Sequence, residues 1–128
     1  MASVKLHNAA GYAQEITARQ HRLLSDEPES NGGKDTGPAP YELLLAALAS
    51  CTSLTLRMYA ERKGWDLGSI DVQARFARDD AGMESISRRI SFGNPLSPEQ
   101  LTRLAEICEK TPVTKTVRQG TAIQTELK

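Results

Sequence analysis

Cys51 is the residue whose type and position most favour chemistry, because a cysteine thiolate is a strong nucleophile that can also be oxidised. It lies in a run from Pro40 to Lys63 that starts with a proline, is rich in alanine and leucine, and meets no helix breaker before Gly64. The run predicts a helix of roughly 36 Å at ~1.5 Å per residue. At helical spacing, Cys51 shares an apolar stripe with Leu44, Ala47, Leu48, Leu54 and Met58.

The stripe alone leaves two interpretations of Cys51 open, because a free cysteine is often only a small buried hydrophobe. A nucleophilic role needs a thiolate, whereas an unperturbed thiol has a pKa near ~8.5 and is mostly protonated at neutral pH. The helix dipole gives little help in the middle of a helix. A catalytic Cys51 would therefore need a nearby guanidinium, itself held by a carboxylate.

The second cysteine, Cys108, is far from Cys51 in sequence, so the pair does not form a secretory disulfide framework. Cys108 falls on a helical stripe with Leu101 and Leu104, which favours core packing. It could resolve an oxidised Cys51 only if their α-carbons come within ~7 Å. The cysteines and the two histidines lack the spacing of zinc ligands, so we expect no metal and no bound cofactor.

The bulk composition limits the class of protein. A chain of 128 residues predicts one domain, residues 1–128. Only 39% of the residues are hydrophobic and 5% are aromatic, so we expect a partner chain to cover part of the long apolar helix. With 16 basic and 16 acidic residues spread along the sequence, no basic stripe predicts nucleic-acid binding. We see no signal peptide and no run long enough for a bilayer, and expect a cytoplasmic protein with no membrane partner.

The order of elements predicts an α+β fold, with strands at both ends of the chain and a long helix between them. Helix starts are marked by Ser97-Pro98 and Thr111-Pro112. Arg88 interrupts the apolar face of one expected strand. The expected strands are 3–7, 12–18, 21–24, 70–76, 86–92 and 123–127, and the expected helices are 40–63, 97–110 and 111–120, with a loop over 25–39.

Several segments carry a resemblance to a known family: Asp26-Glu27-Pro28, Gly32-Gly33, Gly37-Pro38-Ala39-Pro40-Tyr41-Glu42 leading to Cys51, Met58-Tyr59-Ala60, Thr111-Pro112-Val113-Thr114-Lys115-Thr116 and Ile123-Gln124-Thr125. In these the chain resembles the OsmC/Ohr family of small dimeric, thiol-based hydroperoxide reductases. The resemblance covers nearly the whole chain. It implies a single OsmC-like domain with antiparallel sheets packed around a long central helix, in an intertwined homodimer.

The resemblance also implies a function. Cys51 would be the redox-active cysteine of a peroxidase that reduces organic hydroperoxides at the dimer interface in the oxidative stress response. An external thiol or dithiol would be the reductant, and no cofactor would be needed. The competing hypothesis is a non-catalytic relative that binds a small lipophilic ligand in the interface pocket.

Two further residues are assigned by the resemblance. Glu42 matches the family's active-site glutamate, but it lies roughly 13.5 Å from Cys51 along the same helix. It would therefore act on the thiol of the partner subunit rather than on that of its own chain. It could equally just stabilise the helix N-terminus. Related enzymes carry an arginine upstream of the cysteine helix, and from Arg19, Arg22 and Lys34 we select Arg22.

The chain departs from the family pattern at one point. Many members have a Cys-Pro dipeptide where this chain has Thr111-Pro112. Threonine keeps the helix cap but has no redox chemistry. The resolving thiol would then be Cys108 or would come from outside the chain.

Overall fold

The N-terminal residues form a three-stranded antiparallel sheet of β1 (Lys5–His7), β2 (Gln14–Ala18) and β3 (His21–Ser25), with β2 in the centre. The computed structural model describes residues 1–128. Its chain divides into two compact units, residues 1–44 and 45–128. The three predicted N-terminal strands are confirmed, whereas the single domain stays a prediction.

The loop after β3 is organised by the carboxylate of Asp26, which is almost completely buried. This carboxylate accepts hydrogen bonds from the backbone N–H groups of Glu27, Lys34 and Thr36, and from the Thr36 hydroxyl at 2.7 Å. A short 3-10 helix, η1 (Glu29–Asn31), lies in the loop. Gly33 is required here, because a Cβ at this position would lie 2.0 Å from the Glu27 carbonyl oxygen. The predicted loop is therefore an ordered segment.

The long helix α1 runs from Pro40 to Lys63, as the sequence predicts. Its first turn is stabilised by Glu42, whose carboxylate accepts a 2.8 Å hydrogen bond from the Ala39 N–H. After the helix, Gly64 adopts a left-handed conformation with φ of 71°, which glycine tolerates without strain.

The predicted core face of α1 was partly wrong. The buried side chains are Leu48, Thr52, Leu56 and Ala60, which follow one another at intervals of one helical turn. Within the single chain, Leu54 and Met58 of the predicted stripe are exposed. A polar threonine takes a buried position because its hydroxyl is hydrogen-bonded to the Leu48 carbonyl at 2.7 Å.

Helix α1 is also long and apolar enough, by length and composition, to cross a membrane. The expectation that no run of this chain reaches that length was therefore wrong. Core helices meet the same criterion, so this finding is weak support for a membrane span. The absence of a membrane partner stays a prediction.

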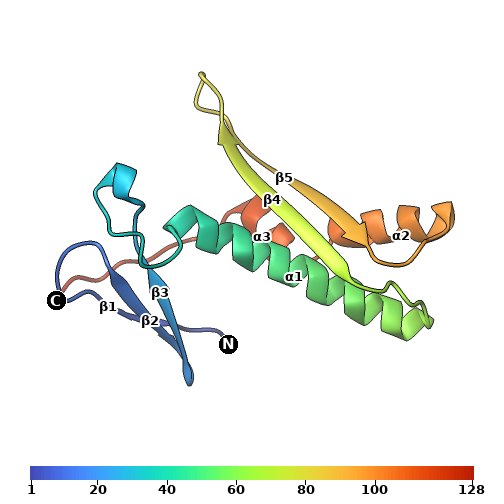
Figure 1. Ribbon diagram of the computed structural model, residues 1–128, viewed down its shortest axis with the longest axis horizontal. Coiled ribbons are helices and arrows are strands. Elements are labelled where there is room, and N and C mark those ends of the chain that lie inside the picture. The colour runs from blue at the N-terminus through green and yellow to red at the C-terminus, as the bar shows by residue number, and fades with distance from the viewer. The chain divides into compact units, whose positions relative to one another are not determined.

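The second unit contains a long hairpin of β4 (Ile70–Arg78) and β5 (Glu84–Phe92), followed by α2 (Pro98–Cys108) and α3 (Pro112–Gln119) (Figure 1). The two strands pair antiparallel along their whole length, with Val72 opposite Ile90. Helix α2 begins at the predicted capping box of Ser97 and Gln100. These elements confirm the predicted order from residue 70 to residue 119.

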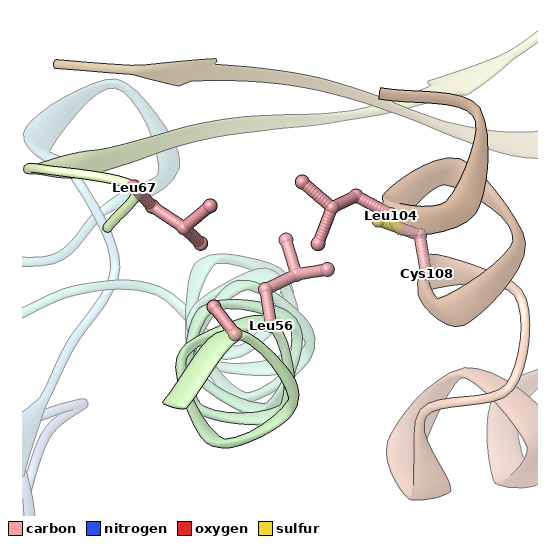
Figure 2. Packing of buried hydrophobic residues seen from close by; sticks show 5 residues of the cluster. Leu56, Leu67, Leu104 and Cys108 are labelled. Carbon is pink, nitrogen blue, oxygen red and sulfur yellow. The ribbon is translucent and has the colours of Figure 1, made fainter. Parts of the chain in front are cut away.

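The core of this unit lies where α1, α2 and the hairpin meet. Leu56, Leu67 and Leu104 point toward one another, and Cys108 follows Leu104 by one turn of α2 (Figure 2). At the edge of the core, the Arg103 guanidinium donates a 2.8 Å hydrogen bond to the Tyr59 hydroxyl, which links α2 to α1. Apolar packing therefore fixes α2, and with it the start of α3, against the cysteine helix.

The predicted last strand, residues 123–127, is absent from the structure. Residues 120–128 have no regular structure, and Ile123 and Leu127 are 87% and 93% exposed. The alternation of apolar residues suits a strand, but a strand also needs a neighbouring backbone to pair with. Within this chain the segment makes no such pairing.

Candidate active site

Cys51 is a free, half-buried thiol in the middle of α1. Its sulfur lies 4.0 Å from the Thr55 hydroxyl, one turn further along the helix. The next residue, Thr52, is completely buried, whereas Leu54 is 56% exposed. Cys51 therefore lies at the boundary between the buried face of α1 and its exposed apolar face, where a substrate or a partner chain could reach it.

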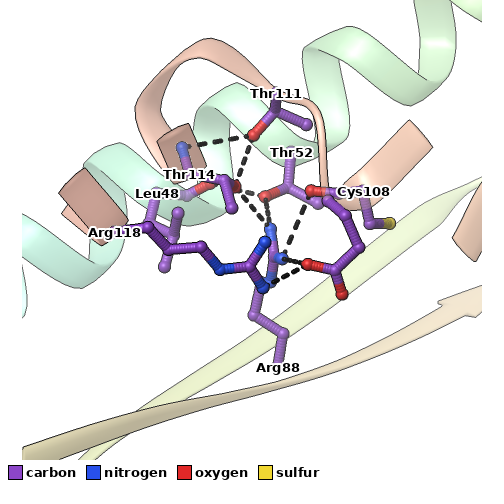
Figure 3. A network of polar contacts seen from close by, with 8 residues as sticks. Leu48, Thr52, Arg88, Cys108, Thr111, Thr114 and Arg118 are labelled. Atoms are coloured by element: carbon purple, nitrogen blue, oxygen red, sulfur yellow. Dashed lines mark hydrogen bonds and ion pairs between the residues drawn. The ribbon is translucent and has the colours of Figure 1, made fainter. Parts of the chain in front are cut away.

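The buried face beside Cys51 holds a polar network centred on Arg88 of β5 (Figure 3). The Arg88 guanidinium donates hydrogen bonds of 2.9 Å to the hydroxyls of Thr52 and Thr114, and one of 3.3 Å to the Cys108 carbonyl. It thereby connects β5 to α1, to the end of α2 and to α3. One side chain fixes the helix next to Cys51 and the corner between the two C-terminal helices.

A buried guanidinium is costly unless it is paired and hydrogen-bonded. The Arg88 side chain is only 13% exposed, and the Glu109 carboxylate lies 3.8 Å from it. Glu109 also forms an ion pair with Arg118 on α3. Two hydroxyls, one carbonyl and one shared carboxylate therefore offset the cost of burying Arg88 at an inward position on β5.

Thr111 is completely buried at the start of α3. Its hydroxyl lies 2.5 Å from the Thr114 hydroxyl and accepts from the Thr114 N–H at 3.4 Å, so it caps the helix as predicted. Because Thr114 also binds Arg88, this cap is part of the same network. The position at which the family resemblance leads us to expect a second thiol therefore carries a buried, hydrogen-bonded hydroxyl.

Cys108 packs in the core, as the helical stripe predicts, although Leu101 on that stripe is 47% exposed. Burial raises the pKa of the Cys108 thiol, while the nearby Arg88 charge lowers it by less. Cys108 is a free thiol and forms no disulfide with Cys51. Its burial and raised pKa make it a poor nucleophile at neutral pH.

Glu42 and Arg22 lie in the first unit, residues 1–44, and Cys51 lies in the second. Glu42 accepts a hydrogen bond from the Ala39 N–H at the start of α1, which fits the second of its two predicted roles, at the helix N-terminus. Arg22 forms a 3.4 Å ion pair with Glu15 on the neighbouring strand, and its side chain is 73% exposed. Their predicted action on a thiol therefore stays a prediction.

The roles of Arg88, Thr52 and Thr114 were not predicted from the sequence. A signal was present, because Arg88 lies on the same, inward face of β5 as Ile86, Ile90 and Phe92, at every second position of the strand. An arginine at such a position indicates a buried, paired guanidinium. In the structure, no group of three or more histidine, cysteine or acidic residues could hold a metal ion.

The structure therefore defines a class of protein: an α+β chain with two antiparallel sheets and a long helix that carries a free thiol. The sequence profile of the family described as OsmC-like protein matches residues 32–126. The chain belongs to the OsmC-like family. No curated protein sequence matches it.

Solved structures share this fold at low sequence identity. A Psychrobacter arcticus 273-4 protein, described as an osmotic stress induced and detoxification response protein, is 21% identical, with a TM-score of 0.80 over 91% of this chain and 88% of the other. The organic hydroperoxide resistance protein OsmC of Legionella pneumophila is 17% identical, with a TM-score of 0.69 over 92% and 89%. OhrB of Bacillus subtilis, an organic hydroperoxide resistance protein, is 23% identical, with a TM-score of 0.64 over 92% and 90%.

Proposed function

We propose that the chain is a thiol-dependent peroxidase that reduces organic hydroperoxides through Cys51. The observation that carries the proposal is a free, half-buried thiol at the border of an exposed apolar helix face, in a chain of the OsmC-like family. Two proteins of the same fold are named organic hydroperoxide resistance proteins, which supports this substrate class.

In the proposed reaction, the Cys51 thiolate attacks the distal oxygen of a hydroperoxide. The sulfur–oxygen bond forms as the oxygen–oxygen bond breaks, and the alkoxide leaves and takes up a proton to become the alcohol. The sulfur is oxidised by two electrons to a sulfenic acid, and the peroxide is reduced by the same two electrons.

The reductant in this proposal is an external thiol. Its sulfur condenses with the Cys51 sulfenic acid to give a mixed disulfide and water, and a second thiol then releases Cys51 and forms a disulfide. Thr111 has no sulfur, and Cys108 is buried with a raised pKa, which supports a one-cysteine cycle. A cytoplasmic location would supply such thiols.

We further propose a homodimer with the two Cys51 helices near its interface. Leu54 and Met58 follow Cys51 on one helical face and are 56% and 54% exposed in the single chain. A second copy that covers this face would surround the thiol with apolar side chains, which would favour hydroperoxides with apolar tails. Glu42 and Arg22 of the partner subunit would then be available to Cys51.

A second candidate function is supported by Thr111. Because the expected second thiol is replaced by a buried, hydrogen-bonded hydroxyl, the chain could bind a small lipophilic molecule at the interface without catalysis. This non-catalytic protein would need the same apolar face and would not need Cys51 as a nucleophile.

The two functions are separated by labelling with a sulfenic-acid probe. We expect cumene hydroperoxide to give probe labelling of the wild-type chain and of Cys108→Ser, and none of Cys51→Ser. Both variants replace one sulfur by oxygen, so each is the matched control of the other. Absence of labelling at both low and high peroxide would contradict the enzyme and leave the lipophile-binding protein.

A further inference from the structure

A groove of about 270 Å³ lies between β5 and α2, entirely within the second unit. Most of its lining is apolar: Ile90, Phe92, Leu101, Leu104 and Ala105. Cys108 lines it as well, while Arg88 and Glu109 are its charged residues. Cys51 does not line this groove, so the groove is separate from the proposed catalytic thiol.

The charged end of the groove lies beside an excess of positive charge. Glu109 lines the groove and pairs with two guanidinium groups, that of Arg88, which also lines the groove, and that of Arg118, which lies outside it. Arg118 takes the closer contact, and Arg88 lies at 3.8 Å. One carboxylate therefore serves two cations, which leaves this part of the groove suited to one more negative charge.

Arg88 also keeps hydrogen-bonding capacity for a ligand. An arginine has five N–H donors, and hydrogen bonds to Thr52, Thr114 and the Cys108 carbonyl use three of them. Of the other two donors, one is on Nη2, which faces the Glu109 carboxylate at 3.8 Å, and one is on Nε, and both belong to a side chain that is mostly buried and fixed by its partners. Donors fixed in this way can bind a carboxylate with little further loss of conformational freedom.

We propose that this groove binds an amphipathic monoanion, a medium-chain carboxylate, with its apolar chain against Phe92, Leu101 and Leu104 and its head group at Arg88. Mostly apolar pockets with a few convergent polar groups are the usual small-molecule sites. The occupant needs both parts, because an apolar molecule leaves the excess positive charge unpaired and a small anion leaves the apolar wall in water. The proposal does not depend on the peroxidase activity, because the groove does not include Cys51.

The test uses the full chain with Cys51→Ser, so that Cys108 is the sole thiol and reports on the groove. Because burial raises the pKa of this thiol, modification by methyl methanethiosulfonate is followed at alkaline pH, where the thiolate fraction increases. Octanoate, octan-1-ol and octylammonium are compared at equal concentration. We expect saturating octanoate to slow modification at least about fivefold, and the alcohol and the amine to change it less than about twofold.

A second variant locates the binding. Leu101→Asp places a negative charge on an exposed position of the groove and should abolish protection by octanoate. Leu127→Asp makes the same change on an exposed residue outside the groove and should preserve protection. Equal protection by all three compounds, or no protection by octanoate, would overturn the proposal. Retained protection in Leu101→Asp would also overturn it, and the comparison of compounds stands even if that variant fails to fold.

Discussion

Arg22 and Arg88 lie on strands of the two different sheets, and the structure gives them opposite surroundings. Arg22 is 73% exposed and pairs with a carboxylate on the neighbouring strand. Arg88 is 13% exposed and joins three helices to β5 through hydroxyl, carbonyl and carboxylate partners. The family resemblance selected Arg22 as a candidate site residue, whereas Arg88 holds the elements around Cys51 together.

The difference shows what each arginine can do. A solvent-exposed ion pair contributes little to stability, so Arg22 is free to turn toward a substrate or a partner subunit. A buried guanidinium with several partners cannot move without leaving hydroxyls and a carbonyl unpaired. Arg88 is therefore a structural residue of the thiol region, and Arg22 remains the candidate for chemistry.

The largest expected effect is on stability at Arg88. Arg88→Ala should lower the free energy of unfolding by about 3–5 kcal/mol, because it breaks a buried charged network. Arg22→Ala should cost less than about 1 kcal/mol, as for an exposed pair. Urea denaturation of both variants measures this, and equal losses would remove the distinction between the two arginines.

A second comparison lies within α2. Leu104→Ala should destabilise the protein by about 2–5 kcal/mol, since it opens a cavity in the core. Leu101→Ala, on the same helix and 47% exposed, is the matched control and should cost much less. If Leu101→Ala lowered the stability measured by thermal unfolding as much as Leu104→Ala, the groove beside Leu101 would be part of the hydrophobic core.

The first unit has its own buried charge, Asp26. The Thr36 hydroxyl is the largest cause of a pKa below the usual range for this carboxyl, and backbone N–H groups add to the effect. A carboxyl with a lowered pKa contributes stability above the ordinary aspartate pKa of ~3.9, and that stability is lost as pH falls through the lower, folded pKa.

Asp26→Asn should therefore flatten the acid side of the stability profile, with the difference from wild type smallest at the lowest pH. Thermal unfolding between about pH 2 and pH 7 checks this, with Asp80→Asn as the control in an exposed turn. A parallel downward shift at every pH would show that the amide disturbs the loop rather than the ionisation.

The smallest expected effect concerns Glu42. Glu42→Gln keeps an oxygen that can accept from the Ala39 N–H and loses only the charge at the start of α1, so stability should change by about 0.3–1 kcal/mol. If Glu42 also serves a thiol of the partner subunit, peroxide turnover should fall by more than this change in stability explains. Unchanged turnover would assign Glu42 to the helix cap alone.

The sequence predicted most of the local structure because the signals were local. Proline at the first helical position and the capping residues Ser97 and Thr111 marked helix starts, and α1 was placed to the residue. What failed depended on partners distant in sequence. Thr52 is buried on the face of α1 where Arg88 donates a hydrogen bond to its hydroxyl, whereas Leu54 lies on the other face and is exposed. The segment 123–127 has no backbone partner in this chain.

The candidate site was predictable in part for the same reason. Cys51 was identified from the helix that carries it, and the cap at Thr111 from its Thr-Pro dipeptide. Arg88 was visible as an interruption of an apolar strand face, but its partners come from α1, α2 and α3. No spacing in the sequence brings those elements together.

The proposed one-cysteine peroxidase can be tested by mass spectrometry after one equivalent of organic hydroperoxide without reductant. We expect sulfenic or sulfinic acid on Cys51 while Cys108 stays a free thiol. A quantitative Cys51–Cys108 disulfide would contradict the one-cysteine cycle, and an unmodified Cys51 would contradict the peroxidase itself.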